Sequence, residues 1–113
     1  METIMLEISS HSSDNRLVLA LKGRVDASGS KTLEESILAH LEQGHTRLIL
    51  DCTEMNYISS AGLRSFLMAA KKIREIPGGT LDLCALAPAV REVFEISGFS
   101  QIFSIHQDMS QFS

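Results

Sequence analysis

Short apolar runs of the strand type alternate with longer segments of helical periodicity along this chain. The alternation follows two strand-like runs that only the polar stretch 9–15 separates, which is typical of a hairpin. Strands that alternate with helices become parallel neighbours through crossovers, so we expect an α/β fold with a mixed sheet of about five strands. The expected strands cover 4–8, 17–21, 47–52, 80–85 and 102–105, and the expected helices cover 28–43, 60–75 and a segment from Pro88 to Gly98.

Apolar spacing distinguishes the two kinds of segment. In 47–52 the apolar residues are consecutive, as in a central strand that is covered on both faces. In 28–43 they recur on one face of a helix, and Gly44 follows where a left-handed C-cap is common. The residues of that helical stripe are Leu33, Ile37, Leu38 and Leu41.

The composition is that of an ordinary globular domain, and we expect residues 1–113 to form one domain. Lys plus Arg number 10 and Asp plus Glu number 14, which gives a net charge of −4. Domains that bind nucleic acid through its phosphates are usually basic, so we expect no direct nucleic-acid binding. There is no apolar run of 18 residues, so no membrane span is predicted. Glu2 and Glu7 stand where a secretory signal would carry positive charge, and we expect a cytoplasmic protein.

No residue pattern predicts a metal or a cofactor. His11, His40, His45 and His106 are not at metal-ligand spacing, and the sequence contains neither a P-loop nor a dinucleotide fingerprint. Cys52 and Cys84 form no C-x-x-C pair and are expected to be reduced, partly buried thiols. The acidic pair Glu34 and Glu35 is expected to be solvated on the first helix.

Two adjacent serines, Ser59 and Ser60, stand where a strand gives way to the second helix. A serine there can cap the helix, or it can act as a nucleophile in a G-x-S-x-G turn. Ile58 occupies the position of the first glycine of that turn, which argues against a nucleophile. An exposed serine there can also accept a phosphate, which the free N–H groups and the positive end of the helix dipole favour.

Several blocks together resemble STAS-domain anti-sigma factor antagonists. The segment 57–63 (Tyr-Ile-Ser-Ser-Ala-Gly-Leu), preceded by Asp51-Cys52-Thr53, is similar to the phosphorylation loop of that family. The glycine-to-aspartate turn 23–26, the strand start 78–81 and the helix 87–94 with Ser97-Gly98-Phe99 are similar to further family blocks, in family order. The resemblance covers nearly the whole chain.

This resemblance implies a STAS fold, with an opening hairpin and helices packed mainly on one face of the sheet. It also implies partner switching without catalysis. The unphosphorylated antagonist binds an anti-sigma factor that is a serine kinase, the sigma factor is released, and phosphorylation ends the binding. A metal-dependent phosphatase restores the unphosphorylated form. The free protein is expected to be a monomer with no cofactor, and the resemblance does not identify the sigma factor or other output.

The family acceptor serine matches Ser60. Many members have an aspartate where this chain has Ser59, so Ser59 is the second choice. Many members also have a hydroxyl residue where this chain has Ala61. The partner-binding residues that the resemblance implies are Asp26, Asn56, Tyr57, Ser59, Ser60, Ala61, Gly62, Leu63 and Arg64.

Two other functions stay open at this point. The chain could be a STAS module that scaffolds a signalling assembly or senses a ligand without switching partners. It could also be a small serine hydrolase that uses Ser60, for which Asp82 and His106 are the only downstream partners of the right types in loosely suitable places.

Overall fold

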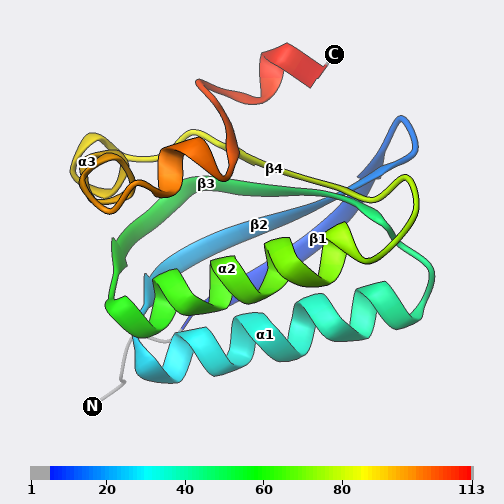
Figure 1. The fold of residues 1–113 in the computed structure, drawn as a ribbon, viewed down its shortest axis with the longest axis horizontal. Helices are drawn as coiled ribbons and strands as arrows, with labels where there is room; N and C mark the ends of the chain where they lie inside the picture. Colours follow the sequence, from blue (N-terminus) through cyan, green and yellow to red (C-terminus); the bar gives the residue numbers. More distant parts are fainter. Residues whose placement is uncertain (1–5, 113) are drawn as a thin grey trace.

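The computed structural model describes residues 6–112, which form a five-stranded sheet with three α-helices (Figure 1). The predicted α/β fold class and the order of the elements are confirmed. The strands are β1 (Glu7–Ser13), β2 (Arg16–Val25), β3 (Arg47–Ile58), β4 (Thr80–Cys84) and β5 (Ser104–His106). The helices are α1 (Ala27–Glu42), α2 (Ser60–Arg74) and α3 (Pro88–Ile96), with the short 3-10 helices η1 (Phe99–Gln101) and η2 (Met109–Phe112).

The strand order β1-β2-β3-β4-β5 means that each strand pairs with its neighbours in sequence. The β1–β2 pair is the predicted antiparallel hairpin, and the other three pairs are parallel. Crossovers of one hand that advance across a sheet in one direction place all their helices on the same face. Leu33 of α1, Phe66 of α2 and Phe94 of α3 accordingly belong to one core on that face. Figure 1 shows α1 and α2 side by side along it.

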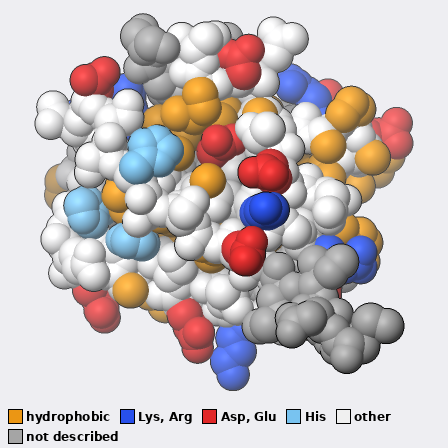
Figure 2. Space-filling view, turned by 180° about the vertical axis from the view of Figure 1, so that it is seen from behind, with side chains coloured by type: hydrophobic (Ala, Val, Ile, Leu, Met, Phe, Trp, Pro, Cys, Tyr) orange, Lys and Arg blue, Asp and Glu red, His pale blue; other side chains and the backbone are white. Residues whose placement is uncertain are grey.

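The two faces of the sheet carry different side chains. In β3, Leu48 and Leu50 pack in the helix-side core, whereas Ile49 packs against Val18 on the other face. Met109 of η2 packs against that smaller cluster. Seen from behind, the surface mixes acidic, basic and histidine side chains with smaller apolar areas (Figure 2).

The hairpin turn is shorter than the predicted stretch 9–15. β1 continues through Ser13, and only Asp14 and Asn15 connect it to β2, with φ of 49° and 68°. Two-residue hairpin turns with positive φ match the twist of the strands, and Asp and Asn tolerate that conformation. The serines before the turn lie on a mostly exposed edge strand, which accepts polar side chains. Residues 4 and 5 of the predicted first strand lie outside the described residues.

β3 is longer than predicted and runs through Ile58 instead of ending at Cys52. The extension pairs in parallel with the end of β2, Arg24 with Tyr57 and Val25 with Ile58. Asp51 therefore lies within the strand, where one carboxylate oxygen accepts from the Thr53 N–H at 3.1 Å. The long strand carries the chain directly to the start of α2.

The predicted helices are confirmed with small changes at their ends. Leu33 and Ile37 are buried as predicted, but Leu38 is 39% exposed, so its place in the apolar stripe was wrong. Gly44 has φ of 94° after the end of α1, which is the left-handed cap conformation that the sequence predicts.

Phe66 is fully buried, and its ring centroid lies 5.7 Å from that of Phe94 and 6.3 Å from that of Phe103. We predict that Phe66→Ala lowers the free energy of unfolding by about 3–5 kcal/mol, because it leaves a cavity in this cluster. Urea denaturation followed by circular dichroism measures the loss. Ile96→Ala is the control, since Ile96 is 80% exposed, and it should change stability by no more than about 0.5 kcal/mol. Equal effects of the two substitutions would contradict this core.

Candidate functional site

Ser59 caps the N-terminus of α2. Its backbone is extended, with φ of −97° and ψ of 176°, and its Oγ accepts from the Gly62 N–H at 3.2 Å. The same hydroxyl donates to the Val25 carbonyl oxygen at 3.2 Å, and the Ser59 N–H donates to that oxygen at 3.0 Å. The Ser59 hydroxyl is thus occupied both as donor and as acceptor.

Ser60 is the first residue of α2 and differs from Ser59 in its surroundings. Its side chain is exposed, and its hydroxyl makes no hydrogen bond within the part of the chain that the structure describes. The first N–H groups of a helix have no carbonyl partner within the helix, and the helix dipole is positive at this end. Ser60 therefore presents an unoccupied hydroxyl where an anion is favoured.

The start of α1 has the same arrangement as the start of α2. Asp26 caps α1, and its carboxylate accepts from the Gly29 N–H at 2.9 Å, so a glycine is the third helical residue in both. A Cβ on Gly29 would lie 2.3 Å from the Arg24 carbonyl oxygen, and one on Gly62 would lie 2.4 Å from that of Val25. Only glycine permits these approaches, so both helices begin directly against the end of β2.

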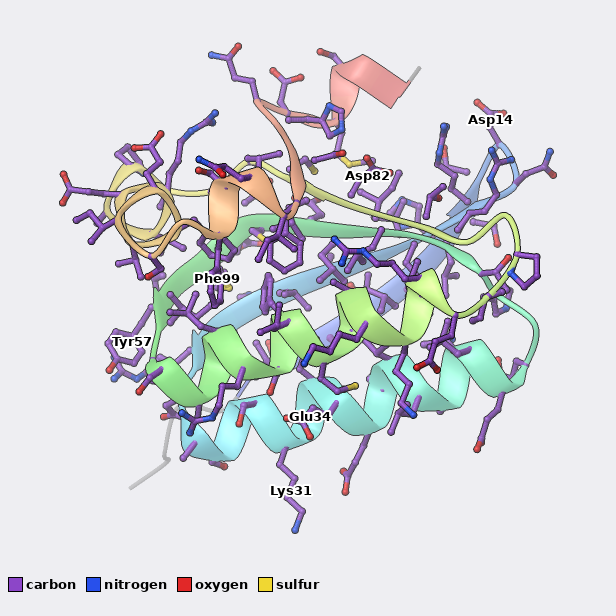
Figure 3. All side chains as sticks on the ribbon, viewed as in Figure 1. Asp14, Lys31, Glu34, Tyr57, Asp82 and Phe99 are labelled. Carbon is purple, nitrogen blue, oxygen red and sulfur yellow. The ribbon has the colours of Figure 1, made fainter. Side chains whose placement is uncertain are left out.

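A buried polar contact joins α1 to α2 close to these ends. The Ser65 hydroxyl is fully buried and lies 2.5 Å from Glu34 Oε2, 3.3 Å from the Ser30 carbonyl oxygen and 3.2 Å from that of Ala61. Figure 3 shows Glu34 between the two helices. The prediction that Glu34 is a solvated acid was wrong for this residue, because the neighbouring helix covers it. No local sequence signal distinguishes Glu34 from Glu35.

Arg24 is the residue near this site that sequence reasoning missed. Its guanidinium carbon lies 4.1 Å from the centroid of the Tyr57 ring, and its Nε lies 3.8 Å from Asp26 Oδ2. Tyr57 is 39% exposed and lies at the end of the sheet close to the start of α2 (Figure 3). The parallel register sets Arg24 beside Tyr57, and the predicted β3 ended too early to reveal that register.

The structure brings most of the predicted partner-binding residues to one end of the molecule. Asp26 and Ser59 follow the paired residues Val25 and Ile58, so the two helix caps are neighbours. Among the others, Asn56, Tyr57, Ser60 and Arg64 are exposed, Ala61 and Leu63 are half-buried, and Gly62 is buried. Leu63 packs against the core, so it supports this surface from beneath.

Cys52 and Cys84 are unpaired and buried, as expected for reduced thiols. Burial raises the pKa of Cys52 well above its usual value, and burial with the nearby Asp51 carboxylate raises the pKa of Cys84 to about 12. Both thiols are therefore protonated and unreactive near neutral pH. Over residues 6–112, no group of three His, Cys, Asp or Glu side chains could hold a metal ion, and no helix is long and apolar enough to cross a membrane.

The geometry does not supply a catalytic triad for Ser60. His106 Nε2 does lie 3.0 Å from Asp82 Oδ1, so the two candidate partners contact each other. Asp82, however, pairs with Ile49 in the parallel register, nine residues before Ile58 at the end of β3. At about 3.3 Å per residue, that separates Asp82 from the start of α2 by roughly 30 Å along the sheet. The triad that the hydrolase alternative required from Asp82, His106 and Ser60 is therefore not formed.

Comparison with known protein families identifies the family to which this chain belongs. The family model for the STAS domain matches residues 7–111. This chain is a STAS domain. A Bordetella bronchiseptica protein, BtrV, that is classed as an anti-sigma factor antagonist is 46% identical over 92 residues, which are 81% of this chain and 78% of that protein. The predicted family, anti-sigma factor antagonists, is confirmed.

Solved structures agree with the fold of this STAS domain. An anti-sigma factor antagonist from Mycobacterium paratuberculosis superimposes with a TM-score of 0.85 at 19% identity, covering 94% of this chain and 89% of that one. SpoIIAA of Bacillus, in its phosphorylated form, gives a TM-score of 0.71 at 18% identity, covering 95% and 96%. The named homologues are regulators and not enzymes, in agreement with the prediction of a protein without catalysis.

The different surroundings of the two serines predict different effects on the stability of the STAS domain. Ser59→Ala removes the cap acceptor and the hydroxyl bond to Val25, and should lower the free energy of unfolding by about 1 kcal/mol. Ser60→Ala removes an exposed hydroxyl that has no partner in the described part of the chain, and should change the free energy of unfolding by less than about 0.5 kcal/mol. Chemical denaturation of both variants beside the parent protein measures the difference. A larger loss for Ser60→Ala would reverse the two assignments.

Gly62→Ala should destabilise the STAS domain although alanine favours helices. The new Cβ would meet the Val25 carbonyl oxygen at 2.4 Å and the Ile58 side chain at 2.8 Å, so α2 would have to move away from β2. We expect a loss of about 1–3 kcal/mol, in the range of overpacked sites, measured by thermal unfolding. Ala61→Ser in the same turn is a control that adds one atom at a half-buried position. An unchanged melting temperature for Gly62→Ala would contradict the close packing.

Proposed function

We propose that this STAS domain works by partner switching, with Ser60 as the phosphorylated residue. In the unphosphorylated state it binds an anti-sigma factor that is also a serine kinase, and a sigma factor is thereby released. Phosphorylation of Ser60 by that kinase ends the binding. The observation that carries this proposal is the exposed Ser60 hydroxyl at the first position of α2, which has no hydrogen-bond partner among residues 6–112.

The start of α2 can accept a phosphate without unfolding. A phosphoserine carries about −1.5 to −2 charges at pH 7, and the free N–H groups and dipole at this helix end favour an anion. Ser60 is exposed, so the added group would not have to displace packed side chains of the described residues 6–112. SpoIIAA, whose fold this chain shares, has a solved structure in its phosphorylated form, which supports a phosphate being compatible with a STAS fold.

Ser60 is a better acceptor than Ser59. A phosphate on Ser59 would remove the hydroxyl proton that bonds Val25 and would disturb the cap to Gly62. The structure also gives a physical account of the serine that stands where many family members have aspartate. Both residue types cap helices well, and Asp26 fills the same role at α1. The substitution therefore keeps the cap and leaves the next residue as the acceptor.

The partner-binding surface would consist of the exposed residues around Ser60. Asn56, Tyr57 and Arg64 are exposed and near Ser60 in sequence, and the half-buried Asp26 is the neighbouring helix cap, so the surface would carry two charges of opposite sign, an amide and one aromatic ring. A dianion that enters a fitted interface loses its water, and this is unfavourable unless the partner supplies cations. A hundredfold loss of affinity requires only about 2.7 kcal/mol. One phosphate can supply that difference without a change of fold.

The remaining parts of the cycle follow from the family. We propose a metal-dependent serine phosphatase that acts on phosphorylated Ser60, a cytoplasmic location, a free monomer and no direct contact with nucleic acid. The pathway at the end of the cycle could control transcription or another process.

Binding to the cognate anti-sigma factor kinase tests this proposal, with genes adjacent to this one as the source of candidates. The parent protein and Ser60→Ala should bind equally well, whereas Ser60→Asp and protein with phosphoserine at position 60 should bind at least tenfold more weakly. Ser97→Asp is a matched control, because Ser97 is exposed at the end of α3 and outside the proposed surface. Its affinity should equal that of the parent protein. Isothermal titration calorimetry measures the affinities.

Mass spectrometry after incubation with the kinase and ATP locates the phosphate. We expect it on Ser60, with none on the Ser60→Ala variant. A phosphate on Ser59 alone would transfer the role to that residue. Absence of phosphate together with equal binding by all variants would contradict partner switching and would favour a non-switching scaffold or sensor.

A further inference from the structure

Arg24, Tyr57 and Asp26 form a small cluster that the partner-switching cycle does not explain. The Arg24 guanidinium stacks over the Tyr57 ring at 4.1 Å, and its Nε faces Asp26 Oδ2 at 3.8 Å. Arg24 and Asp26 have side chains that are 43% and 40% exposed. We name these residues the arginine cluster.

The arginine cluster lies at the same end of the sheet as Ser60. Arg24 is paired with Tyr57, and the next pair, Val25 with Ile58, is followed by the two helix caps Asp26 and Ser59. The Ser59 N–H donates to the Val25 carbonyl oxygen at 3.0 Å, which holds the start of α2 against β2. Ser60 therefore directly follows Ser59, and Ser59 is hydrogen-bonded to Val25, the residue after Arg24.

The guanidinium of Arg24 has capacity for another anion. It has five N–H donors, and its contact with Asp26, at 3.8 Å, is longer than a hydrogen bond. Strong bonds between guanidinium and carboxylate or phosphate are about 2.7–2.9 Å long and often bidentate. The ring of Tyr57 covers one face of the guanidinium and leaves the donors at its edge.

We propose that Arg24 is an intramolecular receptor for the phosphate of phosphorylated Ser60. In the unphosphorylated protein Tyr57 and Asp26 hold the guanidinium at the end of the sheet from which α2 starts. When the phosphate is present, the guanidinium turns to its oxygens and leaves the Tyr57 ring and Asp26. This inference rests on the proposed function, because it takes Ser60 as the phosphorylated residue.

Arg64 is the rival cation, since it stands one helical turn after Ser60 on the same face of α2. Arg64 is exposed, and the structure describes no ion pair or ring contact for it over residues 6–112. A long side chain without such contacts loses rotamer entropy when it becomes ordered. Two neighbours already order the Arg24 side chain, so it has less rotamer freedom to lose than Arg64. The contacts that it gives up, an exposed ion pair at 3.8 Å and an exposed ring contact, are weaker than the charge-assisted bonds that it would form with the phosphate.

This movement would alter the partner-binding surface beyond the added charge. It would uncover the Tyr57 ring, remove the cation from Asp26 and neutralise part of the phosphate. Asp26 and Tyr57 are both among the predicted partner-binding residues. One phosphate would therefore change several contacts with the partner at once.

Phosphoserine placed at position 60 during translation tests the proposal without a kinase. The second pKa of the phosphate, followed by phosphorus NMR, should be lower in the parent protein than in Arg24→Gln by about 0.5 unit, a modest shift because the pair is exposed. Arg91→Gln is the matched control, because it removes an exposed arginine on α3 whose ion pair with Glu95 is separate from the cluster. Its phosphate pKa should equal that of the parent protein.

Tyr57 supplies a second signal, since it is the one tyrosine in a chain without tryptophan. Phosphorylated and unphosphorylated parent protein should differ in the NMR shifts of the Tyr57 ring, and this difference should disappear in Arg24→Gln. Equal phosphate pKa values in the parent protein and Arg24→Gln would overturn the proposal. The proposal would also be overturned if Arg64→Gln changed the phosphate pKa and Arg24→Gln did not. Because the phosphate is installed directly, failure here is distinct from failure of the kinase and binding experiments above.

Discussion

The carbonyl oxygen of Val25 is the point on which the arrangement of this site depends. It accepts both the N–H and the hydroxyl proton of Ser59, and the Cα of Gly62 lies so close to it that no side chain fits between them. These contacts join the end of β2, the end of β3 and the start of α2. They fix the direction in which α2 leaves the sheet, and this direction leaves Ser60 in solvent. Any side chain at position 62, or the loss of the Ser59 hydroxyl that caps α2, would change that direction.

The topology explains why two such helix starts lie together. β2 and β3 are parallel neighbours, so their carboxyl ends reach the same edge of the sheet. The chain leaves each strand into a helix on the same face, and each helix has a capping residue followed three positions later by glycine. Residues 26 and 59, distant in sequence, thus become neighbours. Loops at the carboxyl ends of parallel strands often carry the functional residues of α/β proteins, and the site proposed for this STAS domain lies at such an end.

Local sequence pattern was sufficient for the fold, whereas the site that it suggested stays a prediction. The apolar stripe of α1 and the consecutive apolar residues of β3 predicted the elements, and the family blocks predicted Ser60 as the acceptor. The pattern failed where contacts between distant residues decide the structure. The second half of β3 is polar in sequence and becomes a strand because it pairs with the end of β2. The contacts of Arg24 with Tyr57 and of Glu34 with Ser65 follow from strand register and helix packing, which no local spacing reveals.

The two roles that the sequence suggested for a serine at this turn, helix cap and phosphate acceptor, are compatible because the chain has a serine for each. Ser59 supplies the cap, and both sides of its hydroxyl are bonded. A phosphate on the capping serine itself would replace the hydroxyl proton that is bonded to Val25, and so would remove one bond between the start of α2 and β2. With the cap on Ser59, the proposed phosphate on Ser60 would leave the bonds of the helix start in place. Aspartate in place of Ser59 would leave the same arrangement. Its carboxylate would cap α2, and Ser60 would be the one hydroxyl of the pair that a serine kinase could phosphorylate. In the proposed function, the added charge would change the surface that a partner contacts and would leave the fold beneath it unchanged.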